Sequence, residues 1–490
     1  MFPIRHKALN KKTKKITGPS LTASLAPIAL LLAAMVSIIV FEGAGAIADY
    51  SPWALLSATA VSIILARFSG SLTRRGAVLG LRRSARQILP AVPMLVCIAM
   101  VATTWMLSGV VPLLIDYGLK VLAPGTFLVI TCAVCSVISV LTGSSWSTIA
   151  TIGVAFMGIG TVMGFHPGWV AGAIISGAYF GDKVSPLSDT TVVASSACGV
   201  DLFKHIRYLT ATAAPAMFAA LAVYLIVGIT GSHAEMATES EISSMLAATF
   251  SLNPWVLLIP AITFALILFR VGTLLTLFVS AMLGLAGIFI FQPAIVEMLG
   301  GGNIASVIGL LWRGLGFETG VSTFDDLAGT SGILGMLPTI ALVLSAMMFG
   351  SAMIGTGMLG TISAAILARL KGRFAIVSAT VASGLFINSC TADQYLSIIV
   401  GGNMYRNVYR GAGLEPRLLS RTLEDSVSVT SVLIPWNSCG VTQSTVLGVS
   451  TLVYLPFCIF NWMSPLMSLL MAYTGLGISE PRRMAATASK

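Results

Sequence analysis

Long apolar runs separated by short charged loops restrict what this chain can fold into. Residues 21–41 form one such run, and only 9% of the 490 residues are charged, against about 25% in soluble domains. Lipid offers the backbone no hydrogen-bond partners, so a chain of this composition crosses a membrane as helices. We therefore predict an all-α polytopic membrane protein with about 11–13 membrane segments, including broken helices or re-entrant hairpins.

The basic residues predict the orientation of the chain. Although the net charge is +10, they lie in short loops between apolar runs, which is typical of cytoplasmic loops and not of a nucleic-acid-binding surface. The first apolar run exceeds the roughly 7–15 residues of a signal-peptide core, so we expect a retained span. We expect a multi-pass protein of the cell (inner) membrane with both termini in the cytoplasm. The lipid bilayer is its expected partner, nucleic acid is not, and a homodimer is left open.

A polar segment, GDKVSPLSDTT, interrupts the apolar sequence at residues 181–191. It contains an ammonium group and two carboxylates, Asp182 and Asp189, and each buried charge costs at least about 2.5–3.5 kcal/mol in a bilayer. Pro186 removes a backbone donor and Gly181 permits unusual dihedral angles, so we expect a helix break. Broken backbone at membrane depth persists only where protein or a water-filled cavity satisfies it. The segment therefore predicts an ion site of a transporter.

The second half of the chain repeats features of the first. Three matches share one offset: Leu89-Pro90 with Leu337-Pro338, Met100 with Met348, and Gly109 with Gly357. The polar break at 143–145 has a counterpart at 388–391, and the segment 182–185 has one at 425–428. Chance matching in an apolar background is the alternative interpretation.

Loop charge tests this repeat independently. Loop 160–169 carries no Lys or Arg, whereas its counterpart 405–421 carries four arginines. After the second break the signs reverse, since Lys204 and Arg207 follow in the first half and 440–448 is uncharged. An inverted-topology repeat has such loops on opposite sides of the membrane and its site at the repeat interface near the midplane. The loops expected outside are 160–169 and 440–448, and those expected in the cytoplasm are 74–86, 204–207 and 406–421.

These patterns divide the chain into six parts. They are a cytoplasmic basic tail (1–20), N-terminal spans with a cytoplasmic loop (21–87), a first repeat with the ion-site motif (88–230), a linker with connecting spans (231–333), a second, inverted repeat (334–476) and a cytoplasmic tail (477–490). The acidic segment 232–253 is expected outside. An irregular or amphipathic connection with solvated charges is expected at 293–332.

Carboxylates at the breaks are the candidate ion ligands. Desolvation disfavours a charged carboxylate, so such a group holds a proton or a small hard cation but not readily both, which is the chemistry of cation/proton exchange. Hydroxyl and amide oxygens and freed carbonyls complete a shell around sodium. The expected sodium ligands are Asp182, Asp189, Asn388 and Asp393. The wider predicted ion- or substrate-binding set adds Ser144, Ser145, Ser185, Ser188, Thr190, Ser389, Thr391, Asp425 and Ser428.

Structural roles are the alternative for these residues. Asp182 and Asp189 would then only brace the break, with Lys183 paired to another carboxylate. Serines and threonines commonly return hydrogen bonds to helix carbonyls. Arg421 is close enough in sequence to pair with Glu424 or Asp425. Other polar, aromatic and sulfur-containing residues are interpreted as packing or interfacial. They are Asp116 beside Lys120, Trp146, Trp436, and the CxxC pair Cys132 and Cys135.

Enzyme motifs are missing from this sequence. It contains no nucleophile elbow, phosphate loop or haem motif, and its four histidines have no metal-ligand spacing. We therefore expect a transporter and not a membrane-embedded enzyme or scaffold, with no cofactor besides the transported sodium and protons.

The polar motifs resemble the NhaC family of sodium/proton antiporters. The segments that carry the resemblance are 142–148, 181–191, 201–207, 420–426 and 434–440, within regions 89–207 and 337–440. The resemblance implies a larger ion-transporter superfamily fold of two inverted repeats with hairpins and broken helices.

Substrate is not decided by this resemblance, because similar relatives exchange sodium and protons for small carboxylates such as malate and lactate. An anion carrier needs a fixed positive charge at the breaks, and only Lys183 supplies one there. We therefore expect exchange of sodium (or lithium) for protons, with sodium/proton-coupled exchange of small organic anions as the alternative.

Overall fold

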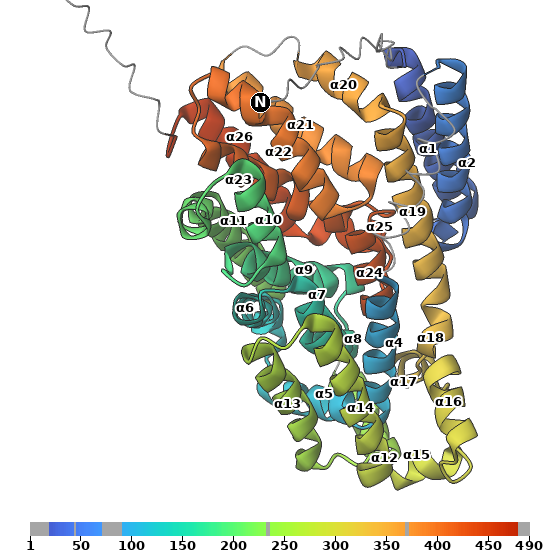
Figure 1. Ribbon diagram of the computed structural model, residues 1–490. Helices are drawn as coiled ribbons and strands as arrows, with labels where there is room; N and C mark the ends of the chain where they lie inside the picture. Colours follow the sequence, from blue (N-terminus) through green and yellow to red (C-terminus); the bar gives the residue numbers. More distant parts are fainter. Residues whose placement is uncertain (1–18, 44–45, 71–90, 232–235, 368–371, 479–490) are drawn as a thin grey trace, which may run out of the picture.

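The computed structural model describes residues 19–43, 46–70, 91–231, 236–367 and 372–478. Within these ranges the chain folds into helices joined by short turns, with no β-strand (Figure 1). The predicted basic tail, the loop 74–86 and most of the C-terminal tail lie outside the described residues. The all-α class predicted from the apolar composition is confirmed.

The spans can be counted from helix length and composition. Eight described helices are long and apolar enough to cross a membrane, and counting each of three bent pairs as one span gives up to 11. This number reaches the lower end of the predicted range. One bend of 63° separates α4 (Ala91–Leu107) from α5 (Val110–Val121). It occurs at Gly109, whose φ of 88° is a left-handed conformation that favours glycine.

The two halves of the chain contain matching series of helices. After α4 and α5, the first half continues with α6 (Pro124–Thr142), α7 (Ser145–Thr148), η2 (Ile149–Gly153), α8 (Val154–Val162), α9 (Pro167–Val184), α10 (Asp189–Cys198) and α11 (Leu202–Thr230). The second half contains α19 (Leu337–Gly355), α20 (Met358–Leu367), α21 (Arg373–Thr391), α22 (Gln394–Gly411), α23 (Pro416–Leu423), η4 (Glu424–Ser428), η5 (Ser431–Leu433), α24 (Ser438–Leu447), α25 (Thr451–Tyr454), η6 (Leu455–Phe457) and α26 (Ile459–Thr474).

Helix lengths and breaks support the predicted repeat. Helices α6 and α21 have 19 residues each, and α10 and α24 have 10 each. The left-handed Gly109 between α4 and α5 recurs as Gly357 between α19 and α20, and the left-handed residue that ends α6, Gly143, recurs as Ala392 after α21. The order of elements thus repeats, while the opposite membrane orientation of the halves stays a prediction.

The remaining helices surround these two series. Helices α1 (Leu21–Glu42) and α2 (Ile47–Phe68) pack together, and α2 lies along α19 at one edge of the molecule (Figure 1). The middle of the chain forms the lower part of Figure 1. Its helices are α12 (Met236–Thr249), η3 (Pro254–Leu257), α13 (Leu258–Leu268), α14 (Thr273–Phe291), α15 (Pro293–Met298), α16 (Ile304–Arg313), α17 (Ser322–Ala328) and α18 (Gly332–Gly335).

Charged residues of the middle segment agree with the expectation in part. Arg313, Glu318 and Asp326 are exposed in the connection between α16 and α18, as predicted.

Asp116 lies on α5, in the first half, and was expected at an interface. It is buried, but its Oδ2 accepts a hydrogen bond from the exposed Lys120 Nζ at 2.6 Å. The two therefore form an ion pair within one helix turn.

Helices α6 and α9 approach each other backbone to backbone. A Cβ added to Gly177 would lie 2.2 Å from the carbonyl oxygen of Cys132, and one on Gly181 would lie 2.3 Å from that of Ser136. Small residues four apart permit such close packing of membrane helices. Gly181 lies inside α9 and has ordinary helical dihedral angles. The prediction that it supplies unusual dihedral angles at the break is therefore wrong, and its role is close packing.

Adding a methyl group at this contact should destabilise the protein. We expect Gly181→Ala to lower the free energy of unfolding by about 1–3 kcal/mol, the usual cost of overpacking, measured as a lower midpoint of thermal unfolding in detergent. The matched control is Gly360→Ala, because Gly360 also lies within a helix and a Cβ there meets no atom within 4 Å. Equal midpoints for the two variants would contradict the packing role.

Candidate functional site

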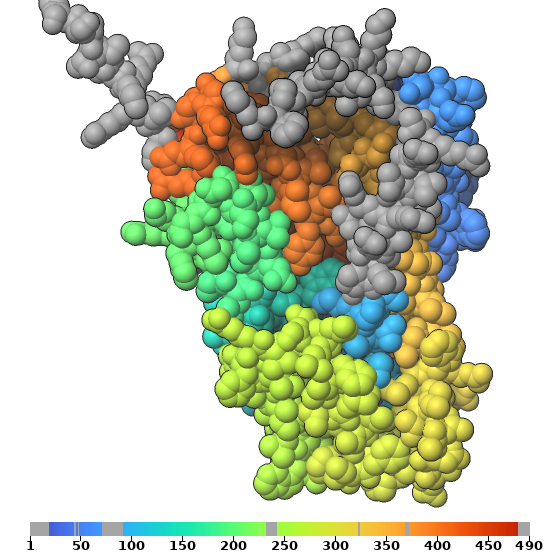
Figure 2. Space-filling view, viewed as in Figure 1, coloured from blue at the N-terminus to red at the C-terminus, as the bar shows by residue number. Residues whose placement is uncertain are grey.

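A cavity of about 540 Å³ lies where the helix breaks of the two halves meet. Its polar lining from the first half includes Ser144, Ser147, Asp182, Asp189 and Thr190. The second half contributes Asp393, Gln394, Tyr395 and Ser438. On the face drawn in Figure 2, the segments around α10, α13–α14 and α22 border a recess at mid-height. The predicted convergence of break residues from both halves is therefore seen as one cavity.

Asp182 is held at the N-terminus of the helix that begins with α7. Its Oδ2 accepts hydrogen bonds from the backbone N–H of Ser145 at 3.2 Å and from the Ser145 hydroxyl at 2.7 Å. Ser144 caps the same helix by accepting a hydrogen bond from the backbone N–H of Ser147. A helix N-terminus stabilises a negative charge, so this arrangement offsets part of the cost of burying the Asp182 carboxylate and fixes its orientation toward the cavity.

Two further carboxylates occupy corresponding places at helix N-termini. Asp393 is the N-cap of α22, and its Oδ1 accepts a hydrogen bond from the backbone N–H of Leu396 at 2.8 Å. Asp189 is the first residue of α10, directly after its cap Ser188. Ala392, the residue before Asp393, has a φ of 54°. This left-handed conformation is energetically unfavourable for a non-glycine residue and is concentrated at functional sites. Three predicted sodium ligands thus line one cavity.

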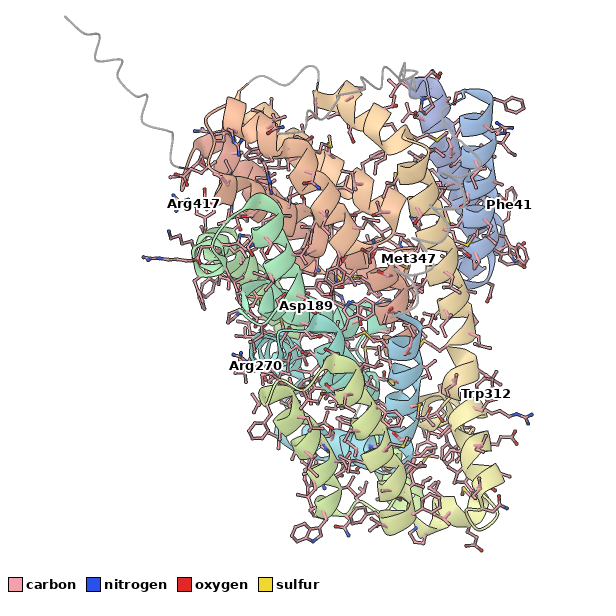
Figure 3. All side chains as sticks on the ribbon, viewed as in Figure 1. Phe41, Asp189, Arg270, Trp312, Met347 and Arg417 are labelled. Atoms are coloured by element: carbon pink, nitrogen blue, oxygen red, sulfur yellow. The ribbon has the colours of Figure 1, made fainter. Side chains whose placement is uncertain are left out.

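An arginine is also among the residues that line this cavity. Arg270 lies in the turn between α13 and α14, has a φ of 59°, and forms no ion pair within the part of the chain that the structure describes. Figure 3 shows Asp189, Arg270 and Met347 on the segments that border the cavity. Sequence reasoning missed Arg270 because its turn lies far along the chain from every break. The net charge of the lining is therefore less negative than its carboxylates alone suggest.

Asp425, the predicted partner of Asp182 in the second half, lies outside the cavity lining. Its Oδ1 accepts hydrogen bonds from Lys183 Nζ, from Thr212 Oγ1 at 3.1 Å and from Ser464 Oγ at 2.8 Å. Its Oδ2 accepts one from Ser468 Oγ at 2.5 Å. All of these residues are buried. Asp425 and Lys183 therefore form the ion pair that the structural alternative anticipated for Lys183.

Several other predicted ligands use their polar groups to brace the breaks. Ser185 Oγ donates to the carbonyl oxygen of Val140 at 2.7 Å, and Ser188 caps α10. Asn388 Nδ2 donates to the carbonyl oxygen of Val427 at 2.9 Å, and its Oδ1 accepts from Asn437 Nδ2 at 2.9 Å. None of these side chains is among the residues that line the cavity.

The remaining predicted ligands of the second half also lie away from the cavity lining. Thr391 Oγ1 hydrogen-bonds with Ser397 Oγ at 2.5 Å, and Ser389 Oγ donates to the carbonyl oxygen of Leu385 at 3.0 Å. Ser428 is buried within η4. The second half therefore brings Asp393 to the cavity, while its predicted neighbours hold the break together.

The two indole side chains near the breaks pack against the hydrophobic core, as predicted. Trp146 also lines the cavity, and Trp436 Nε1 donates to the carbonyl oxygen of Ser389 at 2.8 Å.

Arg421, a candidate partner of Glu424 or Asp425, instead places its guanidinium 4.5 Å from the ring centroid of Tyr208. Within the described residues it forms no ion pair with either acid.

Carboxylates at opposed helix N-termini, gathered between two repeated halves of a polytopic protein, are typical of a secondary transporter with broken helices. The model of the Na+/H+ antiporter family matches residues 6–211 and 177–476 of the chain. The chain therefore belongs to the Na+/H+ antiporter family.

Curated relatives cover most of this chain. The Na(+)/H(+) antiporter NhaC of Alkalihalophilus pseudofirmus is 36% identical over 394 residues, which is 80% of this chain and 83% of the relative. The Malate-2H(+)/Na(+)-lactate antiporter of Bacillus subtilis is 32% identical over 79% of this chain and 81% of the relative. The Arginine/ornithine antiporter ArcD of Halobacterium salinarum is 33% identical over 81% of both chains. The resemblance to the NhaC family is therefore confirmed.

Breaking the buried ion pair should cost much more than breaking an exposed one. Lys183→Met leaves Asp425 buried without its ammonium partner, so we expect a loss of about 3–5 kcal/mol in the free energy of unfolding, seen as a lower thermal midpoint in detergent. The double variant Lys183→Met/Asp425→Leu should recover part of it, because no buried charge is left.

The matched control for this pair is Lys120→Met. Lys120 pairs with Asp116 but its side chain is 65% exposed, so the loss there should be about 0–1 kcal/mol. If Lys183→Met were as stable as Lys120→Met, the buried pair would not hold the end of α9 against η4.

Proposed function

We propose that this protein exchanges sodium for protons across the cell membrane, with both termini in the cytoplasm. The observation that carries the proposal is the gathering of Asp182, Asp189 and Asp393 around one cavity between the two halves. Membership of the Na+/H+ antiporter family supports the same function.

The proposed mechanism is competition between two ligands for the same oxygens. A sodium ion in the cavity is held by carboxylate oxygens, with hydroxyls such as those of Ser144 and Thr190 available to complete its shell. Protonation of a carboxyl group removes its charge and with it the attraction for sodium. The helix N-termini at Asp182 and Asp393 offset part of the cost of burying the charged, sodium-binding form. Binding of one ion therefore releases the other.

Voltage should contribute to this exchange. Because more carboxylates line the cavity than one sodium ion needs for neutralisation, we propose that more protons enter than sodium ions leave. Net charge movement adds about 2.3 kcal/mol per charge for each 100 mV of membrane potential.

Exchange of small organic ions is the second candidate, and Arg270 is the observation that favours it. An anion carrier needs a fixed positive charge at its site, and the presence of Arg270 in the cavity lining supports this candidate, while Lys183 is engaged by Asp425. Relatives named for malate and lactate, or for arginine and ornithine, share about a third of their residues with this chain. Transport of these compounds therefore belongs in the test of function.

Neutralising a carboxylate of the cavity should abolish exchange. We expect Asp182→Asn and Asp393→Asn each to reduce sodium-dependent proton movement at least tenfold, because an amide binds neither ion well. The measurement is the signal of a pH-sensitive dye in proteoliposomes, with gradients of sodium, lithium, malate, lactate or arginine. The control variant is Glu297→Gln, since Glu297 is exposed and far from the cavity lining.

Normal exchange by both asparagine variants would refute the proposed site. Flux driven by malate, lactate or arginine but not by sodium alone would instead establish the second candidate, and Arg270→Gln should then abolish that flux.

Sodium affinity should weaken as pH falls. If one carboxylate is shared by sodium and a proton, the apparent Kd for sodium rises about tenfold per pH unit below the pKa of that group, since each unit of proton competition is 1.36 kcal/mol. Above that pKa the Kd should level off. Sodium titrations of transport rate between pH 5.5 and 9.5, values roughly spanning the usual range of perturbed carboxyl groups, give this dependence. A sodium affinity that does not vary with pH would refute a shared site.

A further inference from the structure

One carboxyl group that the proposed exchange does not use is buried without a counter-ion among the described residues. Glu424 begins η4, its side chain is 0% exposed, and neither of its oxygens forms a hydrogen bond of ordinary geometry there. The Ser428 hydroxyl, four residues on, is the one side-chain hydrogen-bonding group that acts on it. Removing a carboxylate from water without a counter-ion is far costlier than burying the neutral acid. The site therefore fits the protonated form of Glu424.

The nearby cations do not neutralise this group. Lys183 is engaged by Asp425, which also accepts three hydroxyl hydrogen bonds. Arg421, one turn before Glu424, places its guanidinium on the ring of Tyr208 and donates to Met471 Sδ. The adjacent acids Glu424 and Asp425 thus differ sharply, since among the described residues Asp425 forms an ion pair and Glu424 forms none.

The last turn of α9 links Glu424 to the sodium cavity. Asp182 points to Ser145 at the cavity, while the next residue, Lys183, points to Asp425 in η4. The charges of both α9 residues act on Glu424. A change of charge at Asp182 therefore alters the electrostatic free energy of ionising Glu424, as coupled transport requires. The π-helical turn that carries Glu424 is a rare conformation, frequent at functional sites.

The titratable groups around Glu424 come from every helix that packs on η4. Asp182, Lys183, Asp425 and Cys198 act on it directly. The other titratable residues of the packed helices are Asp189 of α10, Arg373 and Cys390 of α21, Tyr395, Tyr405, Arg406, Tyr409 and Arg410 of α22, Arg417 and Arg421 of α23, and Tyr473 of α26.

A polar pair lies one turn before Glu424. Ser420 is four residues earlier in the chain, which places it on the same helix face. Its hydroxyl lies 2.8 Å from Nδ1 of the buried His205 on α11. The other ring nitrogen of His205, Nε2, has no hydrogen-bond partner among the described residues. The helix face that carries Glu424 therefore also carries a buried polar contact with α11.

We propose that Glu424 binds one of the protons carried in the exchange, at a site separate from the cavity where sodium binds. The step is the association of one proton with a Glu424 carboxylate oxygen and its later release, with no other bond made or broken. This inference rests on the proposed sodium/proton exchange and adds a second proton site to it.

The test is the number of protons moved per sodium ion by Glu424→Gln. Glutamine keeps the size of the side chain and mimics the neutral acid, but it cannot release a proton. In proteoliposomes with the potential clamped by potassium and valinomycin, the reversal gradient gives this ratio. We expect the native protein to move at least two protons per sodium and the variant to move one proton fewer, whereas a native ratio of one would overturn the inference. Exchange of labelled for unlabelled sodium should stay within about twofold of native, since the sodium cavity is unchanged.

Two further variants keep the test decisive. Glu415→Gln removes a half-exposed acid that pairs with Arg417, and should keep the native ratio. Glu424→Asp retains a titratable group, so it should keep the native ratio with a shifted pH profile, and it replaces Glu424→Gln if that variant does not fold. A native ratio and native pH profile in both Glu424 variants would overturn the inference while leaving sodium/proton exchange intact. Failure of the native protein to exchange sodium for protons would overturn the proposed function itself.

Discussion

Helix ends placed inside a membrane protein must find partners for their free backbone groups, and the rest of this structure depends on how they do so. Four N-terminal ends are capped by the side chains of Ser144, Ser188, Asp393 and Asn437. Asp182 adds a fifth acceptor at the N-terminus of α7. Of these acceptors, Ser144, Asp182 and Asp393 line the cavity, and their oxygens suit a small cation. Structural need and ion chemistry are therefore met in part by the same atoms.

Much of this arrangement could be predicted from the sequence, because charge in an apolar background is a strong signal. Asp182, Asp189 and Asp393 stand out for this reason, and the structure places all three at the cavity. The repeat was also visible, since residues such as Gly109 and Gly357 have the same conformational demand at equivalent positions. The all-α class and the positions of the breaks depend on local composition, which is why the sequence was sufficient to predict them.

Contacts between distant segments could not be predicted in the same way. Asp425 matches Asp182 in sequence, but Lys183, 242 residues away, engages it outside the cavity. Asn388 has an amide oxygen that could bind sodium, yet its side chain is held by a hydrogen bond from Nδ2 to the carbonyl oxygen of Val427. Arg270 carried no local signal at all, because its importance comes from where the α13–α14 turn is placed. Residue type shows what a side chain can do, and packing decides which partner it meets.

The two helix breaks of each half lie in direct contact. A Cβ on Gly143 would lie 2.5 Å from that of Leu187, which brings the two breaks of the first half together. In the second half the backbone N–H of Ser438 donates to the carbonyl oxygen of Ala392 at 2.9 Å, which joins those two breaks as well. Other parts of the lining come from α13, α14 and the turn between them, from Met94 of α4 and from Met347 of α19. A substitution that displaces one break should therefore displace its partner, and alter the cavity from two sides at once.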